Sequence, residues 1–428
     1  MKDIPSLWEA TAEPAEATPP LTGEARSDVC IVGAGFTGLR AALELAEHGV
    51  ATTVLDTHAP GWGASGRNGG QVNPLLPAHT PETVKAIVGE DAGERLVQAT
   101  VRSADDLFRD IGRLGISCEA RQRGWVRAAH CDSAARELEA QCESWRRTGI
   151  EIEIVDRHGL KDRFGTERYP LGAFTPSGGC IQPLSYARGL ARAATGAGAT
   201  IHGNSPAQRI EKVEAGWWVE TPNGHVVADQ VLLCTNGYTD GLWARLKKTV
   251  IPVVSVQIAT DPLSDNIRSS MLPGGETIAD TRRQIYYGRF DDAGRFLLGS
   301  LALRDSYDDN QEYRRVKAEA LHIFPQLNSA DWSYRWCGTL AVTRDHLPHM
   351  HELAPGVHAG MGFNGRGVAM ANVMGRALAK RAMGARPDEQ PFPITRLNTY
   401  PFHEFHHLGL EVAMRWFALR DRWEAAYG

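Results

Sequence analysis

The stretch that decides the fold class runs from residue 29 to residue 56 and reads VCIVGAGFTGLRAALELAEHGVATTVLD. It opens with an apolar run of strand length, residues 29–32, which ends directly in a glycine-rich turn. Apolar residues then recur at helical spacing until Gly49, a natural stop for a helix. Residues 51–55 have the composition of a second strand. The stretch therefore predicts a strand, glycine turn, helix and strand, the unit of an α/β dinucleotide-binding fold.

The turn has the spacing Gly33-x-Gly35-x-x-Gly38. The first glycine permits the tight turn, the second lets a pyrophosphate approach the backbone, and the third lets the helix pack on the strands. Unpaired N–H groups at the start of the helix suit phosphate oxygens. Asp56 ends the second strand 18 residues after Gly38, where a carboxylate is expected to accept hydrogen bonds from a ribose. The alternative, a glycine turn in a plain α/β domain, leaves this ordered context unexplained.

The composition is that of a globular enzyme. Of the 428 residues, 43% are hydrophobic and 23% charged, and the net charge of −5 argues against nucleic acid as a partner. Seven cysteines without a Cys-x-x-Cys pair favour buried thiols in a reducing compartment. No signal-peptide pattern and no apolar stretch of about 18 residues occurs, so we expect a cytoplasmic protein. Residues 1–24 are expected to form an arm that packs, if at all, against something else.

Four further motifs follow in order. Residues 61–71 read GWGASGRNGGQ, and residues 233–238 read LCTNGY. Residues 336–348 have the pattern Trp-x-Gly-x-Leu-x-Val-Thr-x-Asp-x-x-Pro, and residues 360–368 read GMGFNGRGV. With the glycine turn, these motifs resemble the D-amino-acid oxidase (DAO) superfamily of FAD-dependent oxidoreductases. They are most similar to its branch of γ-glutamylputrescine oxidase and related amine and imino-acid oxidoreductases.

The resemblance implies an α/β fold with a Rossmann-like FAD-binding domain of the glutathione-reductase type. A second, α+β substrate domain should contain a mixed sheet. Residues 25–86, 176–240 and 340–428 are expected to form the FAD-binding domain, and residues 87–175 and 241–339 the substrate (cap) domain. The reaction implied is hydride transfer to flavin N5 from the carbon next to nitrogen in a secondary amine, γ-glutamyl amine, or amino or imino acid. The resulting imine hydrolyses to a carbonyl compound and an amine.

The resemblance also assigns the FAD contacts. They are expected from Gly33, Gly35, Phe36, Thr37, Gly38, Asp56, Ser65, Gly66, Arg67, Asn68, Gly69, Gly70, Gln71, Asn236, Gly237, Gly362, Phe363, Asn364, Gly365, Arg366, Gly367 and Val368. Noncovalent FAD is expected, because relatives that attach FAD covalently use a cysteine near the late strand pair. Counting back from Thr343 and Asp345 places Gly338, and not Cys337, at that position.

The residues expected to act in catalysis are Arg67, Tyr287, Arg289 and Arg366. A positive group near flavin N1 and the C2 carbonyl stabilises the reduced ring, and Arg366 with the following helix N-terminus suits that role. Tyr286 and Tyr287 suit an aromatic cage for an amine, although core packing accounts for them equally well. Arg67, Arg289 and Arg344 are alternative ligands for a substrate carboxylate. No general base is identified, and an amine bound in its neutral form needs none.

The electron acceptor and the reaction class have alternatives. Sarcosine-oxidase-like relatives use a cap lysine to activate oxygen, near the place where this chain has Leu297. The acceptor is therefore oxygen or a quinone or other electron carrier. A flavin monooxygenase is an alternative function, although the Gly-Asp pair typical of that class is absent from the last third of the chain. An FAD-dependent dehydrogenase of another small molecule is a further alternative, and a tRNA-acting protein is disfavoured by the charge.

Two other patterns are expected to be structural. Histidines at residues 346–351 and 403–407 lack a matched set of Cys or carboxylate ligands, so no metal site is expected. Residues 408–424 predict an amphipathic helix. We expect it to pack on its own domain or on a partner subunit more readily than on a membrane, because it has few basic residues.

Overall fold

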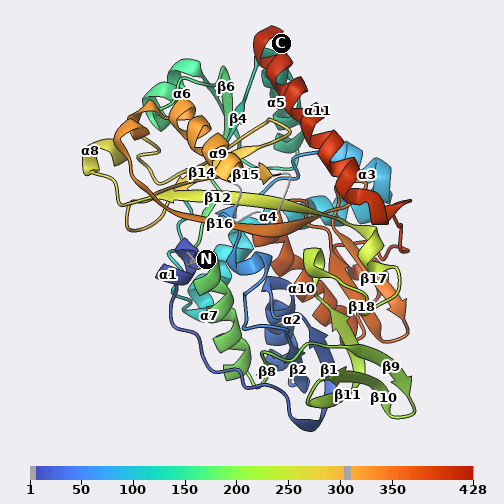
Figure 1. Cartoon of the computed structure of the whole chain (residues 1–428). Coiled ribbons are helices and arrows are strands. Elements are labelled where there is room, and N and C mark those ends of the chain that lie inside the picture. The colour runs from blue at the N-terminus through green and yellow to red at the C-terminus, as the bar shows by residue number, and fades with distance from the viewer. Residues whose placement is uncertain (1–5, 303–309, 428) are drawn as a thin grey trace.

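The computed structural model describes residues 6–302 and 310–427, and its strands form two large sheets (Figure 1). The first sheet has the order β17-β18-β11-β1-β2-β8, with β10 paired to β11 and β9 paired to β10. β1 pairs in parallel with both β2 and β11, as the strand–turn–helix–strand prediction requires. The strands are β1 (Gly23–Val32), β2 (Thr52–Leu55), β8 (Thr200–His202), β9 (Arg209–Val213), β10 (Gly216–Thr221), β11 (Gly224–Leu233), β17 (His349–Ala354) and β18 (Val357–Met361).

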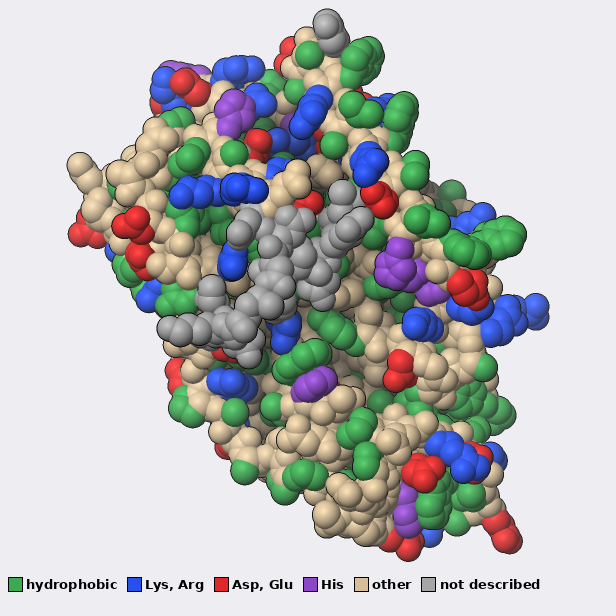
Figure 2. Space-filling model, viewed as in Figure 1, with side chains coloured by type: hydrophobic (Ala, Val, Ile, Leu, Met, Phe, Trp, Pro, Cys, Tyr) green, Lys and Arg blue, Asp and Glu red, His purple; other side chains and the backbone are tan. Residues whose placement is uncertain are grey.

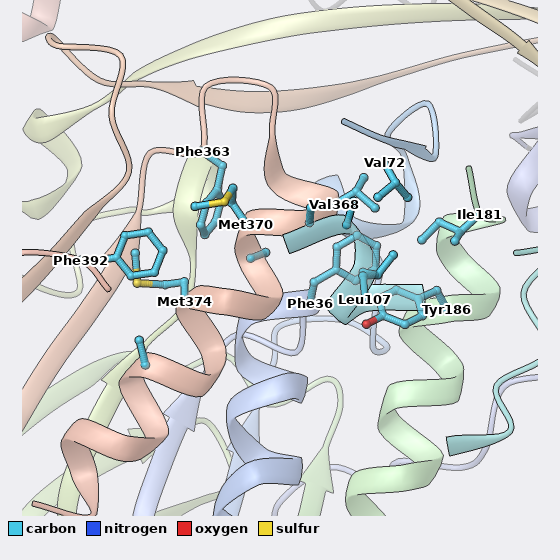
Figure 3. Packing of buried hydrophobic residues seen from close by; sticks show 14 of the residues in the cluster. Phe36, Val72, Leu107, Ile181, Tyr186, Phe363, Val368, Met370, Met374 and Phe392 are labelled. Carbon is cyan, nitrogen blue, oxygen red and sulfur yellow. The ribbon is translucent and has the colours of Figure 1, made fainter. Parts of the chain in front are cut away.

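The helix after the glycine turn, α2 (Phe36–Glu47), is buried at every residue except Glu47. It packs between α7 (Pro183–Gly196) and α10 (Gly367–Ala382), and α4 (Glu90–Leu114) packs on α10. Figure 3 shows Phe36, Tyr186 and Val368 meeting where these helices converge, and the rings of Phe36 and Tyr186 lie 5.1 Å apart. This apolar cluster fixes the start of α2 against the first sheet.

The second sheet has the order β16-β12-β15-β14-β13-β4-β6-β5. Its neighbours pair antiparallel except β13 and β4, which run in parallel, so the sheet is mixed as predicted. The strands are β4 (Trp125–Ala129), β5 (Glu153–Asp156), β6 (Leu171–Thr175), β12 (Ile251–Thr260), β13 (Thr277–Asp280), β14 (Tyr286–Phe290), β15 (Phe296–Ala302) and β16 (Trp332–Val342). The remaining elements are α1 (Leu7–Thr11), α3 (Pro81–Val88), α5 (Asp132–Arg146), α6 (Arg157–Phe164), α8 (Asp265–Arg268), α9 (Asn310–Ile323) and α11 (His406–Tyr427), with a short pair formed by β3 (Gln71–Val72) and β7 (Gly179–Cys180).

The N-terminal arm packs against its own chain, so the expectation that it packs only against something else is wrong. From Ser6 onward the arm forms α1, which a capping box at Ser6 begins. Leu7 and Trp8 are fully buried in a cluster with Trp336. Two large apolar side chains in an otherwise Pro- and Glu-rich segment find their partners on the second sheet.

The fold meets the prediction of buried thiols. All seven cysteines are buried thiols. Among the described residues, none of the helices combines the length and the apolar character that crossing a bilayer requires.

His351 on β17 makes the stability of the fold depend on pH. It is buried, its Nδ1 lies 2.9 Å from the Thr395 carbonyl oxygen, and its ring stacks on His349. Burial lowers the pKa of His351 from 6.5 to about 4. Between these two values the unfolded chain binds a proton that the folded chain does not, so stability is lost as the pH falls. The expected loss at pH 4.5 is roughly 2–3 kcal/mol.

The measurement is urea unfolding of the wild type and His351→Gln at pH 7 and pH 4.5. Glutamine keeps a polar side chain that does not titrate. The variant should lose less stability than the wild type over this range, by the amount given above. Equal losses in both proteins would contradict the assignment.

Candidate active site

A large cavity lies between the two sheets. Its volume is about 1590 Å³, which exceeds the roughly 300–1,000 Å³ of ordinary small-molecule sites and leaves room for a dinucleotide with a substrate. The glycine turn, the 61–71 loop and the 360–368 loop line one side. Residues of β4, β12, β13, β14 and β16 line the other. The motifs that are far apart in sequence therefore meet at one cavity.

The glycine turn has the geometry that a pyrophosphate needs. Gly33 has a φ of +109°, and a Cβ on Gly38 would lie 1.9 Å from the Gly33 carbonyl oxygen. Gly35 is the N-cap of α2 and provides no side-chain cap, so the start of this helix faces the cavity. The Phe36 N–H donates to Ser65 Oγ at 2.9 Å, and a Cβ on Gly35 would lie 2.8 Å from the same oxygen. Helix N–H groups and close backbone approach suit phosphate.

Asp56 closes the turn at the end of β2. Its Oδ2 accepts a hydrogen bond from the Ala34 N–H at 2.6 Å, and its Oδ1 accepts one from the His58 N–H at 2.8 Å. Burial raises the pKa of Asp56, and these two hydrogen bonds oppose the rise. The carboxylate therefore shapes the glycine turn while it lines the cavity.

The 61–71 loop is held from within. The Asn68 side-chain amide donates to the carbonyl oxygens of Ala64 and Ser65 at 3.0 and 2.8 Å, and its Oδ1 accepts from the Gly70 N–H at 2.7 Å. Gly70 has a φ of +70°, which favours glycine. A Cβ on Gly66 would lie 2.3 Å from the carbonyl oxygen of Gly61. These residues fix the backbone along which a flat ring would lie.

The same loop is held from outside by the second sheet. The Arg67 carbonyl oxygen accepts from Gln257 Nε2 at 2.8 Å and from Trp336 Nε1 at 3.0 Å. Gln71 Nε2 donates to the backbone of β13 and β14, at the carbonyl oxygens of Ile278 and Gly288. The Arg67 side chain lines the cavity and donates from Nε to the Trp62 carbonyl oxygen at 2.8 Å. The loop is therefore a fixed wall between the two sheets.

Trp8 braces this wall from behind. Its Nε1 donates to the Asn68 carbonyl oxygen at 2.8 Å, and its ring meets Trp336 edge-on, with centroids 5.6 Å apart. Trp8→Ala should lower the free energy of unfolding by about 3–5 kcal/mol, because it removes a fully buried indole. Trp8→Phe should lose less, since it keeps most of the apolar surface. Thermal unfolding with flavin content per chain tests both variants, and equal losses for phenylalanine and alanine would contradict the packing role.

Two asparagines join the later motifs. Asn236 Oδ1 accepts from the Gly362 N–H at 2.9 Å, and Asn364 Oδ1 accepts from the Thr343 N–H at 2.9 Å. They link residues 233–238, the end of β16 and the 360–368 loop.

Of the residues expected to contact FAD, five do not line the cavity and shape turns or close packing instead. They are Gly38, Gly66, Gly70, Gly237 and Gly362.

Two arginines, the buried Arg366 and the half-buried Arg127, give the cavity a positive wall. Arg366 is the N-cap residue of α10 and donates from Nε to the Leu75 carbonyl oxygen at 2.8 Å. Arg127 on β4 donates to Gln141 Oε1 and to the Pro77 carbonyl oxygen. Burial and then the charge of Arg127 lower the pKa of Arg366. Among residues 6–302 and 310–427, no carboxylate forms an ion pair with either arginine. Such a wall suits negative charge on a ligand.

The two tyrosines of β14 point to opposite faces of the sheet, as successive strand residues do. Tyr286 lies in the core of the second sheet, and its hydroxyl accepts from Arg315 Nη1. Tyr287 lines the cavity, and its hydroxyl lies 2.5 Å from Ser255 Oγ. A Cβ on Gly299 would lie 2.4 Å from the Tyr287 ring. Burial raises the pKa of Tyr287 to about 12, so its hydroxyl is protonated at neutral pH.

Arg289 holds the 61–71 loop and does not line the cavity. It is fully buried, and its guanidinium donates to the carbonyl oxygens of Gly69, Phe290 and Ile181 at 2.7, 3.0 and 2.7 Å. These contacts make it a positioning residue, which corrects the expectation that it binds substrate. Arg344 is exposed outside the cavity, which leaves Arg67 of the three alternatives at the cavity.

Leu297 is also displaced from its expected place. It is buried with Trp8 and Trp336 and does not line the cavity, whereas Leu301 on the same strand does.

Sequence reasoning missed four residues that line the cavity: Trp125, Arg127, Ser255 and Gln257. A polar residue at every second position of an otherwise apolar strand, as at Ser255 and Gln257, was the available signal.

Comparisons with known proteins agree with these motifs. Residues 28–381 match the family described as FAD dependent oxidoreductase, DAO. The chain is 33% identical over 374 residues to a probable oxidoreductase OrdL of Haemophilus influenzae, covering 86% of this chain and 85% of that protein. It is 30% identical over 406 residues to the gamma-glutamylputrescine oxidoreductase of Escherichia coli, covering 92% of this chain and 93% of that protein.

Solved structures show the same fold at lower identity. Glycine oxidase from Geobacillus kaustophilus superposes with a TM-score of 0.72 at 21% identity, over 87% of this chain and 99% of that chain. L-proline dehydrogenase from P. horikoshii superposes with a TM-score of 0.72 at 18% identity, over 88% of this chain and 100% of that chain. On the family match and these relatives, the chain belongs to the DAO family of FAD-dependent oxidoreductases.

Proposed function

We propose that this protein oxidises a C–N bond in a small amine that carries a negatively charged group. The substrate is a secondary amine, a γ-glutamyl amine, or an amino or imino acid. The observation that carries the proposal is the cavity itself. The dinucleotide turn lies at one end, and the aromatic residues Tyr287 and Trp125 and the cations Arg127 and Arg366 form its wall. Aromatic faces suit an amine, and an arginine such as Arg127 suits a carboxylate. The relation to a gamma-glutamylputrescine oxidoreductase supports the same substrate class.

When bound, FAD would supply the oxidation, as the acceptor at N5 of a hydride from the substrate carbon. The chain binds and orients. The start of α2 and Asp56 would hold the dinucleotide, the 61–71 loop would support the ring, and Arg366 with the start of α10 would stabilise the negative charge of the reduced ring. The protonated hydroxyl of Tyr287 would donate a hydrogen bond to the substrate or accept one from it. A neutral amine that loses a hydride becomes an iminium, and water then gives a carbonyl compound, an amine and a proton.

Three finer points belong to the same proposal. FAD is held noncovalently, which is supported by Cys337 facing the core of the second sheet while Gly338 lines the cavity. The first sheet with its helices carries the cofactor, and the second sheet forms the substrate cap. The enzyme works in the cytoplasm, supported by its seven buried thiols, and passes electrons to oxygen or to a quinone or other carrier.

The test is anaerobic titration of the FAD-loaded enzyme, followed by flavin absorbance. The panel contains N-methyl amino acids, proline and pipecolate, D-amino acids and γ-glutamylputrescine, with the matching amines that lack a carboxylate as controls. We expect bleaching by one carboxylate-bearing class and at least tenfold weaker response to its control. Bleaching by NADPH alone would favour the monooxygenase instead. A fully loaded enzyme that no compound of the panel bleaches would contradict C–N oxidation of these classes.

A further inference from the structure

The C-terminal helix α11 walls the cavity with one of its faces. In Figure 1 it runs along one edge of the molecule, from beside α3 to the level of α5. Leu410, Ala413, Met414 and Phe417 line the cavity from this helix. The inner face therefore packs on the helix's own chain, as the sequence led us to expect.

The far end of α11 is anchored to the second sheet by charge. Arg283, in the turn after β13, donates from Nη1 to Asp421 Oδ1 at 2.8 Å and to Glu424 Oε2 at 2.7 Å. His130 Nε2 lies 3.5 Å from Glu424 Oε2. His130, Asp421 and Glu424 lie close enough together to resemble a metal site, but Arg283 pairs with both carboxylates and Arg420 pairs with Glu424, so two cations balance the two negative charges. The cluster is therefore an anchor, and the helix has a defined orientation.

The outer face of α11 is apolar and exposed. The exposed stripe consists of Phe402 and Phe405, just before the helix, and Leu408, Val412, Trp416, Leu419 and Trp423 on it, which are between 58% and 80% exposed. Phe402, Phe405 and Leu408, at the start of the stripe, also line the cavity. Figure 2 shows apolar side chains along this edge of the molecule. From Phe405 the spacings are 3, 4, 4, 3 and 4 residues, which keeps the side chains on one line along the helix. Spacings of three and four are those of a seam between two helices.

The size of this face indicates a protein partner. Taking about 200 Å² for a fully exposed aromatic side chain and about 150 Å² for a leucine or valine, the seven residues expose about 800 Å². The largest apolar patch on a typical monomer is about 300–600 Å². Each partner of a standard protein interface contributes about 800 Å². We propose that a second copy of this chain covers the face, with α11 lying antiparallel to its counterpart.

The order of the side chains supports antiparallel pairing about a twofold axis near Met414. In that register Trp416 lies opposite Val412 of the second copy, Leu419 opposite Leu408, and Trp423 opposite Phe405. Each pair is symmetric about the same point, so one patch complements itself, as a twofold interface requires. In this register a large ring meets a smaller side chain at the centre, where Trp416 lies opposite Val412, and two rings meet at each end, where Trp423 lies opposite Phe405.

The charges on α11 favour a second copy over a bilayer. The helix has three arginines and three carboxylates, and two of the arginines form pairs within it, Arg415 with Glu411 and Arg420 with Glu424. A helix that lies on an anionic membrane is rich in unpaired basic residues on its polar face. Because α11 is neutral overall, apolar burial against another protein is the stronger interaction. This inference does not depend on the substrate.

The experiment is sedimentation equilibrium of the FAD-loaded protein from 1 to 50 μM. The wild type should be a dimer. Leu419→Glu and Leu408→Lys should each weaken dimerisation at least 100-fold. The double variant L408K/L419E places the introduced lysine opposite the introduced glutamate of the other copy, and should bind at least tenfold more tightly than either single variant. Met383→Glu, at an exposed apolar residue outside the face, is the matched control and should remain a dimer. Flavin content and circular dichroism verify folding of each variant.

Each other outcome overturns the proposal. A wild type that is monomeric at 50 μM has no such interface. A dimer that persists in Leu419→Glu uses another surface. A double variant no tighter than the single ones excludes the antiparallel register. If wild type, but not Leu419→Glu, co-sediments with vesicles of phosphatidylglycerol and phosphatidylcholine and remains monomeric in solution, the face binds a bilayer instead.

Discussion

Gly38→Ala should abolish most FAD binding and destabilise the protein. The added Cβ would lie 1.9 Å from the Gly33 carbonyl oxygen and 3.2 Å from Ile31 Cγ2. Both neighbours belong to β1 or the turn that follows it, and a backbone oxygen has nowhere to move. Overpacking of a rigid core costs about 1–3 kcal/mol, and a backbone clash belongs at or above the upper end. The helix must shift off the first sheet, which moves its N-terminus away from the pyrophosphate.

The measurement is the ratio of flavin to protein absorbance after purification, with thermal unfolding of the same samples. Gly112→Ala is the matched control, because Gly112 is also helical and a Cβ there would meet nothing within 4 Å. That control should be neutral or stabilised by up to about 1 kcal/mol, as alanine is the better helix former. A Gly38→Ala protein with normal flavin content would show that the turn does not hold the dinucleotide as we propose.

Arg366→Met should lower kcat/KM about 10²–10³-fold, the loss typical of removing one group that stabilises developing charge. Methionine roughly keeps the length of the side chain but removes the buried cation at the start of α10. The negative charge that the flavin gains on reduction is then less well stabilised, so the flavin midpoint potential should also fall. Arg366→Lys should recover part of both losses.

The control for this prediction is Arg381→Met on the same helix, where the arginine pairs with Glu352 away from the cavity. It should leave kcat/KM within about twofold of the wild type. The midpoint potential should stay within a few millivolts of the wild type, since distant charges are screened. The potential is measured by reductive titration against reference dyes. An unchanged potential in Arg366→Met would place its cation away from the flavin.

Local patterns predicted the β1–α2–β2 unit of the first sheet because its signals lie within 28 residues. The strand, turn and helix each have their own composition, and the glycines have steric reasons that act over short distances. β1 nevertheless begins at Gly23, six residues before the apolar run. Its first half pairs with β11 along an exposed stretch, where burial does not select apolar residues. A pattern of hydrophobic residues therefore finds only the buried half of such a strand.

The second side of the cavity was harder to predict. Arg127 and Trp125 reach it because β4 pairs in parallel with β13, about 150 residues later in the chain. No local pattern encodes that pairing. Arg289 was misassigned for a related reason: two backbone carbonyls from distant segments, those of Gly69 and Ile181, and the carbonyl of the neighbouring Phe290 take its hydrogen bonds. The charge of a residue predicts a role only when its partners are known.

The contacts that hold the 61–71 loop also determine when the loop can form during folding. Gln257 and Trp336 reach the Arg67 carbonyl oxygen across 190 and 269 residues of sequence, and Gln71 reaches the second sheet across more than 200. Contacts between distant segments form late, because the entropy of closing long loops must be overcome first. The loop is therefore ordered only after both sheets exist. On refolding, recovery of flavin binding should be the slowest phase, following the return of secondary structure.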